Sequence, residues 1–159
     1  MLQKFFTVYV QNHPVSNAIR DSVWVYAFDQ VGHLIGLAVF AGAILIVDLR
    51  LLGGGFKDRP VAQVAKDAQP WLIGGFLTLV VTGTVQLMSN ATKEYFSPFF
   101  WFKMYVMLAA IIYTLTIRQR VATAAEGRVP PLWSKAVGLV SIVLWSGVAI
   151  PARLIGLLS

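Results

Sequence analysis

The chain has 159 residues, of which 57% are hydrophobic and only 13% are charged. Soluble domains carry about a quarter of charged residues, so this composition indicates an integral membrane protein and excludes an ordinary soluble enzyme. The net charge of +6 fits a membrane protein whose basic residues gather in cytoplasmic loops, and we expect no nucleic-acid partner. The absence of Cys excludes disulfides, thiolate metal sites, iron–sulfur clusters and covalently attached haem.

The first 22 residues predict a short arm at the membrane surface. Its apolar face is made by Phe5, Phe6, Tyr9 and Val10. Pro14 begins a second short piece, because proline is favoured in the first turn of a helix. We therefore expect one or two short N-terminal interfacial helices.

Four long apolar segments follow the arm, and each is long enough to cross the hydrocarbon core as a helix. They run at about 24–52, 71–88, 99–117 and 133–158. Continuous apolar runs exclude a transmembrane β-barrel, whose strands alternate. The sequence therefore predicts an all-α fold, an integral membrane four-helix bundle that forms a single membrane domain over residues 1–159.

The polar connections predict further local features. Residues 62–69 are expected to form a short surface helix that ends before Pro70. Asp48 and Arg50 lie at the inner end of the first segment, where we expect them to form a pair with each other.

Basic residues concentrate in two of the three connections, and this bias predicts the orientation. The first and third connections hold Arg50, Lys57, Arg59, Lys66, Arg118, Arg120, Arg128 and Lys135. The second connection holds only Lys93. By the positive-inside rule the first and third connections face the cytoplasm. We therefore expect a multi-pass protein of the bacterial inner (cytoplasmic) membrane, surrounded by lipid, with both termini on the periplasmic side.

His33 is the most informative residue, because no other strongly polar side chain occurs between Val31 and Val47. An ionisable side chain inside a membrane is costly, so it needs a local partner or a ligand. The only other histidine, His13, lies in the arm. Ligation of an intramembrane iron or copper ion by imidazole would therefore run through His33, and a bis-imidazole dihaem cytochrome is excluded. The simpler interpretation is a histidine that bonds a neighbouring helix.

The predicted topology places the strongest polar groups of all four segments in the outer half of the membrane. These groups are His33, Gln86, Lys103 and Arg153. Asp29 precedes His33 by four residues and shares its helix face, so its carboxylate is placed to accept the second N–H of the imidazole. Gly32 and Gly36 leave a thin wall beside His33 that admits a neighbouring helix or a flat ring.

These features predict a binding site for one haem b. His33 would be the axial ligand and Asp29 would orient it. Lys103 and Arg153 would bind the propionates, since charge-assisted bonds to carboxylates are strong, or Lys103 would complete the coordination of the iron. Lys103 and Arg153 also have a simpler interpretation, because long basic side chains near helix ends reach toward the interface.

Several local sequences resemble a family of small, uncharacterised bacterial four-helix membrane proteins over essentially the whole chain. They are His33 with its glycines, residues 48–53 (DLRLLG), Phe102-Lys103, and Trp145 followed by residues 152–156 (ARLIG). More distantly, the arrangement resembles the copper resistance protein D membrane domain and the HemJ type of protoporphyrinogen IX oxidase. The HemJ-type resemblance implies haem b on His33, with Lys103 as second ligand or propionate partner. The other resemblance implies copper handling.

We therefore expect a haem-binding subunit that transfers one electron between a quinone or a periplasmic partner and the haem, in a redox complex or a homo-oligomer. Three alternatives remain open. The first is a copper-transport module in which His33 and nearby Met residues pass Cu(I). The second is a HemJ-like oxidase, and the third is a structural accessory subunit in which His33 only packs. Catalytic residues are not predicted.

Overall fold

The computed structural model describes residues 1–55, 58–124 and 127–158, with the side chains of Leu2 and of residues 153–158 outside the description. Every regular element in these residues is a helix. Four segments are long and apolar enough to span a membrane: Val23–Leu51, Val61–Ser89, Pro98–Ala122 and Pro131–Ala152. The prediction of an all-α, multi-pass membrane bundle is confirmed.

The N-terminal arm contains short helices, as predicted: α1 (Leu2–Lys4), the π-helical η1 (Phe5–Val10) and α2 (Pro14–Asp21). His13 caps α2, because its Nδ1 accepts a hydrogen bond from the backbone N–H of Val15. Phe6 packs against an aromatic cluster of Tyr95, Phe100 and Trp101. This packing fixes the arm to the connection after the second spanning segment and to the start of the third.

The first two spanning helices are α3 (Val23–Leu51) and α4 (Val61–Ser89). α3 stops just before Gly53, whose φ of +86° suits glycine and ends the helix. α4 corrects the expectation of a separate surface helix at 62–69, because it runs without a break through Pro70. Pro70 is exposed and lies in the first third of α4, where the backbone carbonyl of Lys66, which it leaves without a partner, can reach water because Lys66 is exposed too.

A short helix, α5 (Ala91–Phe96), leads into the third spanning segment. That segment is made of α6 (Pro98–Tyr113), the π-helical η2 (Thr114–Arg118) and α7 (Gln119–Ala122). The last helix is α8 (Pro131–Leu158).

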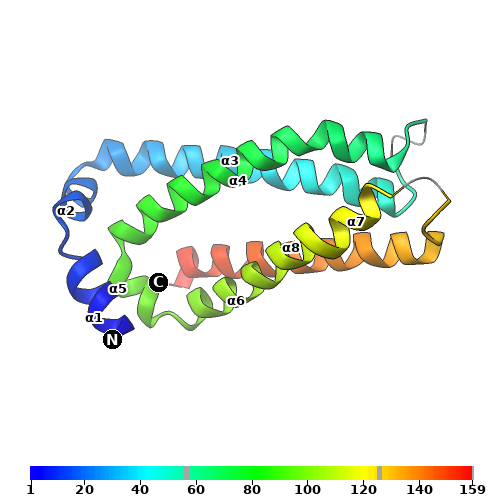
Figure 1. Ribbon diagram of the computed structural model, residues 1–159. Helices are drawn as coiled ribbons and strands as arrows, with labels where there is room; N and C mark the ends of the chain where they lie inside the picture. The colour runs from blue at the N-terminus through cyan, green and yellow to red at the C-terminus, as the bar shows by residue number, and fades with distance from the viewer. Residues whose placement is uncertain (56–57, 125–126, 159) are drawn as a thin grey trace.

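The spanning helices form two pairs, α3 with α4 and α6 with α8, and α3 joins the pairs through its contact with α8 (Figure 1). α3 and α4 approach very closely at their glycines. A Cβ on Gly75 would lie 2.8 Å from the backbone nitrogen of Phe40, and one on Gly36 would lie 2.9 Å from Cγ2 of Thr78. The thin wall predicted at Gly36 is therefore covered by a neighbouring helix.

The buried core lies toward the end of the bundle where α3 ends and α8 begins. Its buried members are Ala43, Val47, Leu51, Val64, Ala68, Ala122 and Val137. Gly138 lets α8 approach α3 here, since a Cβ at that position would lie 3.0 Å from the carbonyl oxygen of Asp48. The termini and α5 lie at the opposite end (Figure 1).

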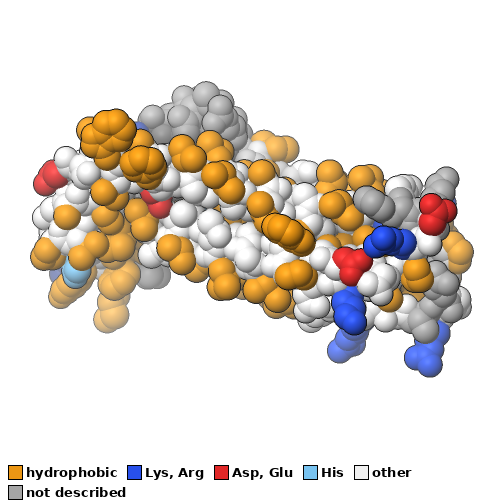
Figure 2. All heavy atoms as spheres, turned by 90° about the horizontal axis from the view of Figure 1, so that it is seen from above, with side chains coloured by type: hydrophobic (Ala, Val, Ile, Leu, Met, Phe, Trp, Pro, Cys, Tyr) orange, Lys and Arg blue, Asp and Glu red, His pale blue; other side chains and the backbone are white. Residues whose placement is uncertain are grey.

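The surface matches a membrane protein whose basic residues gather at one end. Large apolar side chains are exposed on all four spanning segments, including Leu34, Leu77, Leu108 and Val143. On the face that Figure 2 shows, most Lys and Arg side chains gather at one end of the molecule. The two basic connections meet at that end, because Lys135 of α8 lies against Gly53 after α3.

Candidate polar site around His33

His33 lies on α3 against α4 and is hydrogen-bonded to Thr82. Its Nδ1 is 2.7 Å from Oγ1 of Thr82. The hydroxyl of Thr82 has a single proton, which it donates to the backbone carbonyl of Thr78 at 2.7 Å. Nδ1 of His33 must then be the donor to Thr82, so a neutral imidazole carries its lone pair on Nε2. Nε2 is therefore the ring nitrogen available to a ligand.

Small residues on both helices make this arrangement fit. Gly83 lies beside the imidazole, since a Cβ there would be 3.6 Å from Cε1 of His33. A Cβ on Gly32 would be 3.5 Å from Cγ2 of Thr82. The two glycines hold α3 and α4 close enough for the His33–Thr82 bond to form between them.

Further polar groups surround His33. The charges of Asp29 on α3 and of Lys103 on α6 both act on its ring. Oδ2 of Asp29 and Nε2 of Gln86 are buried without a hydrogen-bond partner among the described residues. Buried polar atoms without partners are rare in folded proteins and call for a ligand, an ion or water.

Glu94 on α5 joins this group of residues, although it is not among the predicted site residues. Burial raises the pKa of the Glu94 carboxyl, and the positive charges of Lys103 and Lys93 act in the opposite direction. A carboxylate five residues before a predicted spanning segment, beside a lysine, is the signal that would have identified it. Glu94 gives Lys103 an acidic neighbour at the same end of the bundle as His33.

Two of the predicted roles need comment. Asp29 was expected to accept the second N–H of His33, but Thr82 does so instead, because α4 lies closer to Nδ1 than the turn that carries Asp29. Arg153 lies on α8, and its side chain falls outside the described residues. Of the predicted site residues, Asp29 and Lys103 are the two whose charges act on His33.

A second polar site lies at the opposite end of the bundle. Arg118 donates from Nε to Oδ1 of Asp48 at 2.7 Å and from a terminal nitrogen to the carbonyl of Ile44 at 3.1 Å. The expected pair of Asp48 with Arg50 is therefore wrong. Arg50 instead bonds the backbone carbonyl of Arg59, outside the bundle. Asp48 points inward on α3, where only a cation from another helix reaches it.

The number of protein side chains that could bind a metal decides whether the site suits a bare ion or a haem. Among the described residues, no group of three or more His, Cys, Asp and Glu side chains is placed to hold a metal ion. A bare ion needs several protein ligands, whereas haem iron needs one or two axial ligands from the protein. Of these alternatives, a single imidazole with a free Nε2 fits an axial haem ligand better.

Comparison with known proteins gives a family and no function. No curated protein and no solved structure matches the chain. The resemblances to the copper resistance protein D membrane domain and to the HemJ type therefore stay predictions. A family model described as "Family of unknown function (DUF6644)" matches residues 19–158, which is most of the chain. The protein belongs to this family.

Proposed function

We propose that the protein binds one haem b in the outer half of its bundle, with Nε2 of His33 as axial ligand, and serves in one-electron transfer. The observation that carries the proposal is the hydrogen bond from Nδ1 of His33 to Thr82. Ligating histidines almost always donate their other ring N–H to a fixed acceptor, which sets the tautomer and the ring orientation. Thr82 meets this requirement from a neighbouring helix.

The surrounding residues fit the polar edge of such a group. Lys103 supplies a positive charge near His33 for a propionate carboxylate. We propose the same role for Arg153. The buried, unpartnered amide nitrogen of Gln86 offers a further donor. His33 on α3 would hold the haem, and Lys103 on α6 would bind its carboxylates.

Each residue has a defined part in this function. When bound, haem supplies a centre that accepts and releases one electron. Thr82 holds the His33 ring, Lys103 neutralises negative charge, and the apolar helices keep water away. The acidic neighbour Glu94 balances the positive charge of Lys103.

The orientation proposed for the bundle places the site near the periplasm. Both basic connections lie at the far end from His33, and the positive-inside rule puts them in the cytoplasm of a bacterial inner membrane. Four spanning segments place both termini on the same side, which is then the periplasmic side. A partner, in a redox complex or a second copy, would exchange electrons from that side or within the membrane.

The test is the haem content of protein purified in mild detergent from haem-replete cells. We expect about one haem b per chain, with a Soret band and α and β bands on reduction. His33→Ala removes these bands, and His13→Ala keeps them because His13 only caps α2. Folded wild-type protein without haem would contradict the proposal. Stoichiometric copper in that protein would favour copper transport. The absence of both haem and copper would favour a structural accessory role.

Protoporphyrinogen oxidation is tested separately. The haem-loaded wild type is tested for oxidation of protoporphyrinogen IX. If it shows this activity and Lys103→Met loses it, the proposal extends to a HemJ-like oxidase. Haem without this activity leaves electron transfer as the function.

A further inference from the structure

Two basic side chains from different helices meet at the turn that follows α3, at the end of the bundle far from His33. Lys135 on α8 lies against Gly53, because its Cε would be 3.8 Å from a Cβ on that glycine. The backbone N–H of Gly53 donates to the carbonyl oxygen of Arg50 at 3.1 Å. Nε of Arg50 donates to the carbonyl oxygen of Arg59, in the same connection, at 2.9 Å. Arg50 and Lys135 therefore flank one turn.

Neither of these two cations has a carboxylate partner among the described residues. The ion pairs found there are Arg59–Asp67 and Arg118–Asp48, and each engages its own acid. Asp58, in the same connection, is exposed and belongs to neither pair. The two cations are therefore available to an anion from outside the protein.

An exposed apolar side chain lies one helical turn inward from each cation. Ile46 precedes Arg50 by four residues and is 40% exposed, and Leu139 follows Lys135 by four residues and is 56% exposed. Residues four apart share a helix face. Because α3 ends at this end of the bundle and α8 begins there, both apolar side chains lie on the membrane side of the cations. On the face that Figure 2 shows, the basic end likewise gives way to apolar side chains along the bundle.

We infer that Arg50 and Lys135 bind the phosphate of an anionic phospholipid, whose acyl chains cover Ile46 and Leu139. A phospholipid presents a negative phosphate directly above hydrocarbon, which matches the order of charge and apolar surface at this turn. Arginine binds phosphate through its planar fork and lysine binds it as a point charge. Basic clusters of this kind, where helices meet the membrane surface, bind anionic head groups. A soluble anion would leave the apolar side chains uncovered.

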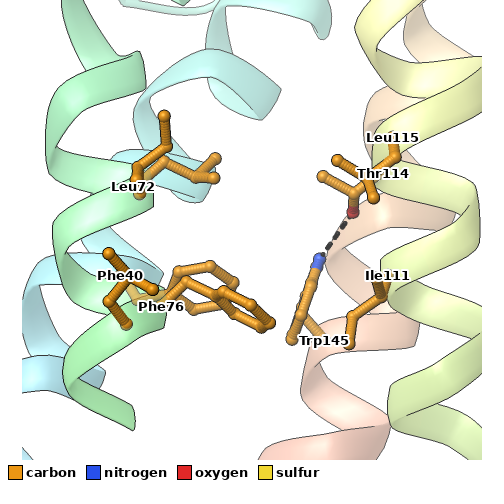
Figure 3. A pocket seen from close by; sticks show the side chains of 9 residues that line it. Phe40, Leu72, Phe76, Ile111, Thr114, Leu115 and Trp145 are labelled. Carbon is orange, nitrogen blue, oxygen red and sulfur yellow. Dashed lines mark hydrogen bonds between the residues drawn. The ribbon is translucent and has the colours of Figure 1, made fainter. Parts of the chain in front are cut away.

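The apolar groove between α4 and α6 is a different place for a lipid, but it cannot select a head group (Figure 3). Its cavity measures about 150 Å³, and none of the described residues that line it is charged. Nε1 of Trp145 donates to Oγ1 of Thr114 at 3.1 Å, which engages the polar side chains of the lining with each other (Figure 3). A preference for an anionic head group therefore distinguishes the basic turn from the groove.

The test is native mass spectrometry of delipidated full-length protein with phosphatidylglycerol, which is anionic, or phosphatidylcholine, which is neutral overall, with identical acyl chains. A cation near the membrane surface typically strengthens binding of anionic lipid about fivefold, so we expect a preference of roughly 20-fold for phosphatidylglycerol. Arg50→Gln with Lys135→Gln should abolish this preference. Lys135→Gln alone, at an exposed position, should lower it about fivefold and serves as a second variant if the double variant does not fold.

The matched control is Arg120→Gln with Arg128→Gln, which removes the same charge from the same end at two exposed positions and should keep the preference. An equal loss in the two double variants would mean that net charge, and no site, attracts the lipid. Equal binding of the two lipids by the wild type would also overturn the inference. Displacement of phosphatidylglycerol by millimolar inorganic phosphate would assign the turn to a soluble anion instead. The inference goes beyond the proposed function, and the test gives its result whether or not the protein binds haem.

Discussion

Arg118 and Asp48 form a buried ion pair, although 70 residues separate them in the chain. Their side chains are only 2% and 0% exposed. Asp48 belongs to the α3–α4 pair of helices, and Arg118 belongs to η2, which continues α6. The π-helical turn of η2 is a local departure from α-helix of a kind that is frequent at functional positions. The ion pair therefore ties the two halves of the bundle together at the end far from His33.

Removing one member of this pair should destabilise the protein strongly. Asp48→Ala leaves the Arg118 guanidinium buried without its counter-charge, and losses of about 3–5 kcal/mol are typical in that situation. The matched control is Asp67→Ala, because the Arg59–Asp67 pair is exposed and such pairs contribute about 0–1 kcal/mol. Denaturant unfolding in detergent measures the loss of stability in both variants. Equal losses for the two variants would mean that the buried pair does not clamp the helices.

The close approach of α3 and α4 should depend on Gly75. A Cβ at this position would meet backbone atoms of Phe40 at 2.8–2.9 Å, and backbone cannot rotate away as a side chain can. We expect Gly75→Ala to lower the thermal unfolding temperature and to weaken haem binding by moving Thr82 away from His33. Gly74→Ala is the control, because nothing lies within 4 Å of its Cβ and alanine favours helix by about 1 kcal/mol. If Gly75→Ala changed neither the unfolding temperature nor haem binding, the two helices would not pack this tightly.

Thr82→Val should change the haem site without unfolding the bundle. Valine keeps the shape of threonine but cannot accept the hydrogen bond from His33, so the ring loses its fixed orientation. Loss of such a partner typically weakens metal affinity 10–100-fold, and we expect a loss of that size in haem titrations. Thr84→Val is the matched control, since Thr84 only bonds its own helix backbone at Val80. Identical titrations for the two variants would remove Thr82 from the site.

The raised pKa of Glu94 predicts a pH dependence of stability. Because the folded protein binds the proton of this carboxyl more tightly than the unfolded chain does, the free energy of unfolding falls as the pH rises above the ordinary value of 4.5 and through the folded pKa. Glu94→Gln removes this contribution. We expect the unfolding temperature of the wild type to fall relative to that of Glu94→Gln as the pH rises above 4.5. A difference in unfolding temperature between the two proteins that does not change with pH would contradict the raised pKa of Glu94.

Hydropathy and helix length were enough to predict the four spanning segments, because each is an unbroken apolar run. The continuation of α4 through Pro70 escaped prediction, since proline is a strong stop signal and only its position near the membrane boundary makes it tolerable. Local spacing also favoured the wrong partners for the key polar side chains. Asp29 is close to His33 in the sequence, and Arg50 is close to Asp48. The actual partners, Thr82 of His33 and Arg118 of Asp48, are brought in by tertiary packing.

Chemical rescue of His33→Gly is the most direct test of the central claim, which is that Nε2 of His33 is a haem ligand. Glycine leaves a space where the imidazole was, beside Gly83, and free imidazole is small enough to enter it. The account predicts that His33→Gly loses the Soret band when it is prepared with haem and regains it on addition of millimolar imidazole, while His33→Leu does not. A haem spectrum in His33→Gly that equals the wild-type spectrum without imidazole would contradict ligation by His33.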